Sequence, residues 1–141
     1  MEKCFMVFGQ INYLAVLVGG VIAMILGAIW YSPVLFGNIW MKLVGLKESD
    51  ITKAKSTRVM TISVLTSLIE TLALAALIVL TRTYSPQKGL YVAFIVSIGI
   101  LSASWLSNTL YEQKPLKLWL IHAGYRVIYL LINGAILGAW R

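Results

Sequence analysis

The chain has 141 residues, of which 60% are hydrophobic and 12% are charged, and its formal net charge is +7 at pH 7. The polar residues are too few to cover the surface of a soluble domain of this length. The composition therefore excludes a soluble protein and indicates a membrane protein. A bilayer core offers the backbone no hydrogen-bonding partner, so the chain must cross it as helices or as a closed barrel. The apolar runs are long and unbroken instead of alternating, and we therefore expect helices.

Four apolar runs are long enough to cross a bilayer, because about 20 residues at about 1.5 Å each span a hydrocarbon core of about 30 Å. They lie at residues 10–31, 59–81, 89–111 and 116–140. The expected fold class is an all-α integral membrane protein, with residues 1–141 forming a single four-helix transmembrane domain.

Residues 32–58 form the long connection between the first two runs. Its first half is apolar and aromatic but too short to span, and Phe36, Trp40 and Leu43 could line one face of a short interfacial helix. Its second half is polar, and Ser49 or Asp50 could cap the start of the second spanning helix.

Lysine and arginine residues predict the orientation, because cytoplasmic loops carry an excess of them. One side of the membrane carries seven: Lys42, Lys47, Lys53, Lys55, Arg58, Lys114 and Lys117. The other side carries four: Lys3, Arg82, Lys88 and Arg141. We therefore expect a multi-pass protein of the cell membrane with both termini outside the cytoplasm. The positive charge suits contact with the lipid bilayer and its anionic head groups, whereas no basic soluble domain exists to bind nucleic acid.

Two ionisable residues, Glu70 and Arg126, lie deep inside the second and fourth runs. Each costs about 2.5–3.5 kcal/mol in the membrane unless it faces a partner or water. The fourth helix carries one stripe of polar residues at i, i+4, i+7 and i+11, which are His122, Arg126, Tyr129 and Asn133. Counting from the charged helix ends places the polar residues in the inner half of the bilayer, and Ser97, Ser104 and Asn108 are expected to share a face of the third helix. The candidates for a substrate or ion pathway are Glu70, Asn108, Glu112, His122, Arg126, Tyr129 and Asn133.

This polar cluster has two interpretations. A Glu70–Arg126 pair could simply lock the second helix to the fourth. Alternatively, Arg126 contacts an anion or a head group and Glu70 carries a proton. We expect no enzyme and no metal or other cofactor, because no nucleophile motif or metal-ligand pattern is present and a lone His122 makes a poor metal centre.

Small residues recur every four positions on three of the helices, a spacing that lets helix backbones approach closely. They are Gly19, Ala23 and Gly27 on the first helix, Gly99, Ala103 and Ser107 on the third, and Gly134 and Gly138 on the fourth. Any one of these seams could pack within the chain or between subunits, and having three of them favours a homo-oligomer.

Four stretches of the sequence together resemble a known family: I-N-Y-L-A-V (11–16), G-A-I-W-Y-S-P-V-L-F-G-N-I-W (27–40), N-T-L-Y-E (108–112) and H-A-G-Y-R (122–126). Over about residues 10–140 the chain is similar to small bacterial membrane proteins of the domain-of-unknown-function 1761 family. The resemblance implies a four-helix fold in a bacterial inner membrane and no particular activity. It nominates the positions Asn12, Trp30, Tyr31, Ser32, Pro33, Gly37, Trp40, Asn108, Glu112 and Tyr125.

The sequence therefore predicts a homo-oligomeric channel or transporter-like protein with a polar cluster in the inner half of the membrane. The alternative is a non-catalytic membrane scaffold or a lipid-binding accessory subunit.

Overall fold

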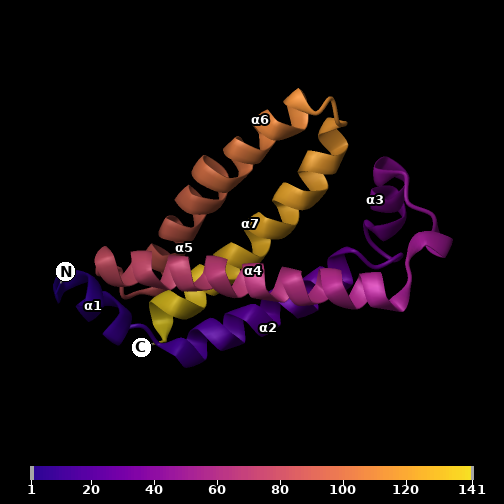
Figure 1. Ribbon diagram of the computed structural model, residues 1–141. Coiled ribbons are helices and arrows are strands. Elements are labelled where there is room, and N and C mark those ends of the chain that lie inside the picture. Colours follow the sequence, from indigo (N-terminus) through magenta and orange to yellow (C-terminus); the bar gives the residue numbers. More distant parts are fainter. Residues whose placement is uncertain (1, 141) are drawn as a thin grey trace.

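The computed structural model describes residues 2–140, so Arg141, one of the residues used to predict the orientation, lies outside the described residues. Within this range the chain is helical and contains no strand. The elements are α1 (Glu2–Gly9), α2 (Tyr13–Trp30), α3 (Gly37–Val44), the 3-10 turn η1 (Glu48–Asp50), α4 (Lys53–Leu80), α5 (Pro86–Phe94), the π-helix η2 (Ile95–Ser102), α6 (Ala103–Tyr111) and α7 (Leu116–Ala139) (Figure 1).

Four helical stretches are long and apolar enough to cross a membrane, at Tyr13–Trp30, Lys55–Leu80, Pro86–Tyr111 and Leu116–Ala139. This confirms the expected fold class, with α3 as the short helix between the first and second spans. The sequence did not lead us to expect α1.

The helix starts follow local capping chemistry. The side chain of Asn12 accepts a hydrogen bond from the backbone N–H of Ala15 at 3.1 Å and so begins α2. Thr52 caps α4 in the same way, which starts that helix well before residue 59. The prediction that Ser49 or Asp50 caps it was wrong, because the Asp50 carboxylate instead accepts from the backbone N–H of Lys47 at 3.0 Å.

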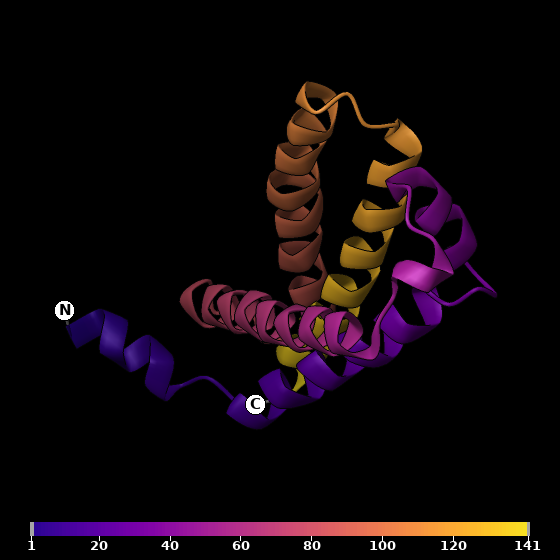
Figure 2. The ribbon, with the colours of Figure 1, turned by 45° about the vertical axis from the view of Figure 1, so that its right-hand side comes forward.

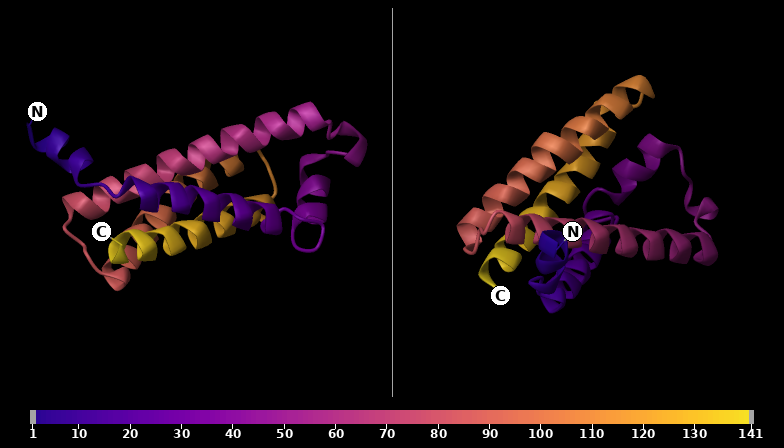
Figure 3. Two further views of the ribbon diagram at one scale, coloured as in Figure 1. Left: turned by 90° about the horizontal axis from the view of Figure 1, so that it is seen from below. Right: turned by 60° about the vertical axis from the view of Figure 1, so that its left-hand side comes forward.

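The chain runs back and forth, so that both termini lie at one end of the molecule, and α3 and the 112–115 loop lie at the other (Figures 1 and 3). We call these the terminal end and the α3 end. Helix α7 is the central element, because it packs against α2, α4, α5, η2 and α6.

The two ends of the bundle are packed very differently. Near the terminal end, α5 and α7 approach backbone to backbone: a Cβ placed on Gly138 would lie 3.2 Å from the Cα of Gly89, and one placed on Gly89 would collide with the carbonyl oxygen of Gly134. Toward the α3 end, α4 diverges from α6 and α7 (Figures 1 and 2). The site described next lies in this divergent half.

Candidate functional site: a half-open cavity with an ion pair

A cavity of about 540 Å³ lies between α2, α4, α6 and α7, in the half of the molecule nearer α3. Met24, Ala28, Val59 and Met60 make part of its wall apolar. Ionisable, hydroxyl and aromatic side chains line the rest. A smaller hollow of about 350 Å³ lies beside Leu17 and Leu72, and the described residues that line it are uncharged.

The central polar feature of the cavity is an ion pair between α4 and α7. The Arg126 guanidinium donates through Nη1 to Oε1 of Glu70. The side chains are only 31% and 20% exposed for Arg126 and Glu70, respectively. The second carboxylate oxygen of Glu70 is buried and has no hydrogen-bond partner in the part of the chain that the structure describes. The two residues that the sequence singled out therefore meet within one chain, although one oxygen is left unsatisfied.

Trp105 of α6 and His122 of α7 extend this cluster. The Arg126 Cζ lies 5.1 Å from the centroid of the Trp105 ring, a cation–π distance. The same Trp105 ring stacks on His122 with 4.8 Å between centroids. Trp105 was not among our sequence candidates, because a tryptophan near a helix end is typical of the membrane interface and nothing in its local sequence indicates that it turns inward.

Tyr31, just beyond the end of α2, holds His122 from the α3 side. Its hydroxyl lies 2.7 Å from Nδ1 of His122. Burial raises the pKa of Tyr31, so the phenol keeps its proton and can donate to that nitrogen. Trp40 of α3 packs edge-on against Tyr31 at 5.7 Å and also lines the cavity. Its buried indole N–H has no hydrogen-bond partner among the described residues.

The closed end of the cavity lies toward the terminal half. Tyr129 is 1% exposed there, and one helical turn further Asn133 is fully buried. The Asn133 amide donates to the carbonyl oxygen of Gly19 at 3.3 Å and to the Thr71 hydroxyl at 3.0 Å, which ties α7 to α2 and α4. The stripe on α7 therefore changes role along its length: His122 and Arg126 face the cavity, and Asn133 fastens the packed half.

The family described as "Protein of unknown function (DUF1761)" matches residues 14–138. The chain belongs to this family. No curated protein and no solved structure matches the chain.

The most specific family stretch of this DUF1761 protein builds the turn between α2 and α3. Ser32 donates to the carbonyl oxygen of Ile29 at 2.7 Å, and the Asn38 amide donates to that of Pro33 at 3.2 Å. Gly37 is required because a Cβ there would lie 2.7 Å from the Ser32 carbonyl oxygen. This tight turn carries Tyr31 and Trp40 to the cavity.

Other family positions attach α2 to α7. The indole of Trp30 donates to the carbonyl oxygen of Ile121 at 3.0 Å. The Tyr125 hydroxyl donates to that of Ala23 at 2.8 Å. A Cβ on Gly27 would lie 3.2 Å from the same hydroxyl, so this small residue of α2 lets the tyrosine approach.

Two candidates of the DUF1761 protein, Asn108 and Glu112, lie outside the cavity. Both are exposed, and Glu112 pairs with Lys114 at 2.5 Å on the surface. The π-helix η2 explains part of this, because its i→i+5 pattern turns α6 relative to a regular helix. Ser97 is consequently buried while Ser104 and Asn108 are exposed, so the expectation of a shared face was wrong.

The small residues of the third span also lie on the outside. Gly99 and Ala103 are exposed, and a Cβ on Gly99 would meet nothing within 4 Å. Gly134 and Gly138, by contrast, pack inside the chain against α5. Among the described residues, no group of three His, Cys, Asp or Glu side chains could hold a metal ion.

Proposed function

We propose that this membrane protein is a carrier whose small polar solute binds in the cavity beside the Glu70–Arg126 pair. The observation that carries the proposal is the position of the pair, in the wall of a cavity that is closed toward one half of the bundle. A volume of about 540 Å³ is within the range of small-molecule sites, roughly 300–1,000 Å³. Ionisable residues inside membrane spans most often mark a substrate or ion pathway.

The closed end of the cavity favours a carrier over a channel. A channel needs a continuous polar path, but beyond Tyr129 the course along α7 is filled by the fully buried Asn133 and by the close contact of Gly89 with Gly134. A carrier, in contrast, keeps its site closed on one side while it is open on the other.

Unsatisfied polar atoms favour a binding site over a purely structural lock. A pair retained only for stability is expected to have its hydrogen bonds satisfied, because each buried unpaired polar atom costs about 1–3 kcal/mol. Among the described residues four buried side-chain atoms lack a partner, and two of them, Oε2 of Glu70 and the indole N–H of Trp40, belong to residues that line the same cavity.

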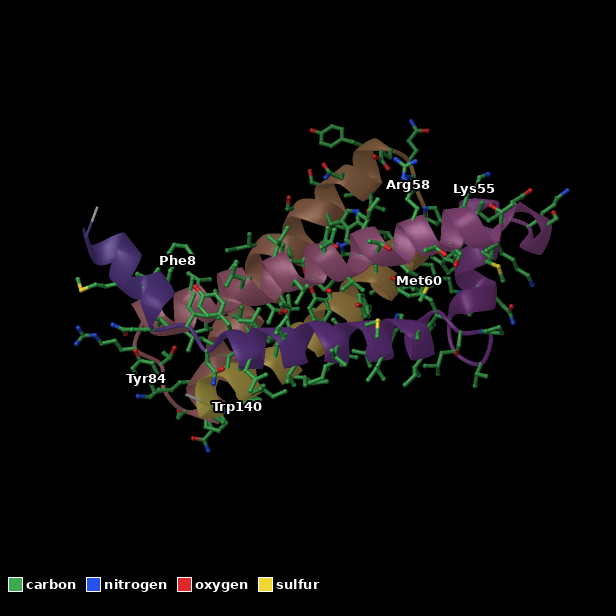
Figure 4. All side chains as sticks on the ribbon, turned by 60° about the horizontal axis from the view of Figure 1, so that its bottom comes forward. Phe8, Lys55, Arg58, Met60, Tyr84 and Trp140 are labelled. Carbon is green, nitrogen blue, oxygen red and sulfur yellow. The ribbon has the colours of Figure 1, made fainter. Side chains whose placement is uncertain are left out.

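The cavity is expected to open toward the cytoplasm. Lys55 and Arg58 lie at the α3 end of α4 (Figure 4), and Lys114 lies in the loop at the same end. These are among the residues whose excess predicts the cytoplasmic side.

The test uses a single cysteine in the cavity wall. Cys4 is the sole cysteine, so Cys4→Ser gives a cysteine-free background. Ser63 lines the cavity and is exposed, whereas the neighbouring Ile62 is 50% exposed but is not in the lining. We expect Ser63→Cys to react with a membrane-impermeant thiol reagent added on the α3 side, and the matched control Ile62→Cys to stay unreactive in lipid.

The accessibility pattern separates the candidate functions. Faster reaction of Ser63→Cys from the α3 side than from the other side supports the carrier, whereas equal reaction rates from both sides would contradict a cavity closed at one end and favour a channel. If it reacts no faster than Ile62→Cys, the cavity holds no water and the carrier proposal fails.

A lipid-binding accessory subunit is the second candidate. It is favoured by the divergence of α4 from α6, which leaves Val59 62% and Met60 54% exposed in the lining of the cavity. Such a subunit would bind lipid at the cavity and transport nothing in reconstituted vesicles.

A further inference from the structure

The charge balance of the cavity restricts what can bind in it. Among the residues that line it, Glu70 and Arg126 are the two with a formal charge when His122 is neutral. They have opposite signs and contact each other. The lining of the cavity therefore has no net charge, and a ligand that enters the pair must keep it so to avoid a buried unpaired charge.

Hydrogen-bonding capacity remains on both partners of the pair. On the acidic side, the buried oxygen Oε2 of Glu70 can still accept. On the basic side, the described residues show one hydrogen bond from Arg126, through Nη1, although a guanidinium has five donor N–H groups. The indole N–H of Trp40 is another donor that has no partner within the described range. A ligand that fits these groups offers a cation or donor to Glu70 and acceptor oxygens to Arg126 and Trp40.

A ligand with a single charge fits less well. An anion that took Glu70's place on Arg126 would leave the carboxylate buried and unpaired, and a cation on Glu70 would do the same to the guanidinium. Removing one partner of a buried pair is costly because the other charge remains uncompensated. A ligand that carries both charges can insert between the two residues and pair each of them.

We propose that the cavity binds a zwitterion with an ammonium group, a carboxylate or phosphate group, and an apolar part. The anionic group binds the Arg126 guanidinium, where bidentate contact is available. The ammonium group binds Glu70. The apolar part lies along the wall made by Met24, Val59 and Met60. This inference names the substrate class of the proposed carrier and so rests on that function.

Two sources supply this chemistry. An amino acid with an apolar side chain would enter from water. The ethanolamine phosphate head group of a phospholipid would enter sideways, between the diverging helices α4 and α6 (Figure 2). The two sources share the ammonium and the anionic group, and they differ in the route.

The experiment measures binding to the wild-type protein with matched probes. For the lipid source, native mass spectrometry compares retention of dioleoylphosphatidylethanolamine with that of dioleoylphosphatidylglycerol, which lacks the ammonium group. For the water source, a thermal shift in nanodiscs compares L-leucine with 4-methylpentanoate and with isopentylamine, which each keep one of its charges. Losing one charged contact is expected to weaken binding about tenfold or more.

Variants then locate the binding. Glu70→Gln and Arg126→Gln should each reduce binding of the preferred zwitterion about tenfold. Glu112→Gln, at the exposed ion pair with Lys114, should leave it unchanged. The proposal is supported if the protein binds one of the zwitterions better than its singly charged analogues and if both cavity variants lose this preference. The zwitterion that is preferred identifies the source.

The proposal is overturned if neither zwitterion binds better than its singly charged partners, or if the preference survives in the cavity variants. The probe comparison uses wild-type protein, so it remains decisive even if a variant fails to fold. If the preference for zwitterions is not found but Ser63→Cys still reacts from one side, the carrier proposal stands. An unreactive Ser63→Cys with intact zwitterion binding would overturn the carrier alone.

Discussion

At the scale of single residues, the Glu70–Arg126 pair combines a structural and a functional role that mutation can separate. Breaking a buried pair by removing one partner leaves an uncompensated charge, whereas replacing both partners by apolar residues is often neutral for stability. Neither side chain is fully buried, with 31% and 20% exposure for Arg126 and Glu70, so the penalty is expected at the low end of that for buried pairs.

Arg126→Leu should therefore lower the free energy of unfolding by about 2 kcal/mol, and the double variant Glu70→Leu with Arg126→Leu by less than about 1 kcal/mol. Both variants should lose zwitterion binding. Unfolding followed by circular dichroism in nanodiscs, together with the binding assay, measures the two effects. A double variant that binds like the wild type would reduce the pair to a helix lock.

At the scale of helices, the sequence predicted the spans, which the thickness of the bilayer determines. It did not predict features that depend on contacts with neighbouring helices. All four spans were predicted because hydrophobic length is a property of each segment. The π-helix was not, because the apolar run Ile95–Ser102 carries no local signal for an i→i+5 pattern. The faces of α6 were consequently misassigned, and Asn108 was expected at a site from which it is absent.

The close contact of α5 with α7 gives a prediction with a second glycine as its control. Gly89→Ala places a methyl group against the carbonyl of Gly134, so the two backbones must separate. Such overpacking typically costs about 1–3 kcal/mol. Gly9→Ala, in α1, meets nothing within 4 Å and should be neutral or slightly stabilising. Melting temperatures of the two variants measure the difference, and equal values would mean that α5 does not pack on α7 in this way.

At the scale of the whole molecule, the cavity is formed within a single chain. The sequence indicated that Glu70 and the stripe on α7 lie at similar depths, but it could not show the divergence of α4 from α6 that creates the space. It also left open whether the two charges meet within one chain. Because Glu70 and Arg126 do so, the site needs no axis between subunits, and oligomerisation becomes a separate question.

We nevertheless expect a homo-oligomer, because α6 and the segment before it expose small and polar residues where lipid would surround a monomer. Gly99, Ala103, Ser104, Ser107 and Asn108 are all exposed. Hydroxyl and amide groups in lipid are better satisfied against another helix, and small residues let that helix approach. Native mass spectrometry from nanodiscs should give a multiple of the 15.6 kDa chain.

Two variants in the same segment locate the contact. Gly99→Leu should shift the protein toward the monomer, because the larger side chain keeps a second helix at a distance. Ile98→Leu, at a neighbouring residue that is also exposed, should leave the mass unchanged because it conserves the side-chain volume. A wild-type protein that is strictly monomeric would contradict this prediction and would leave the exposed polar residues of α6 for a different membrane partner.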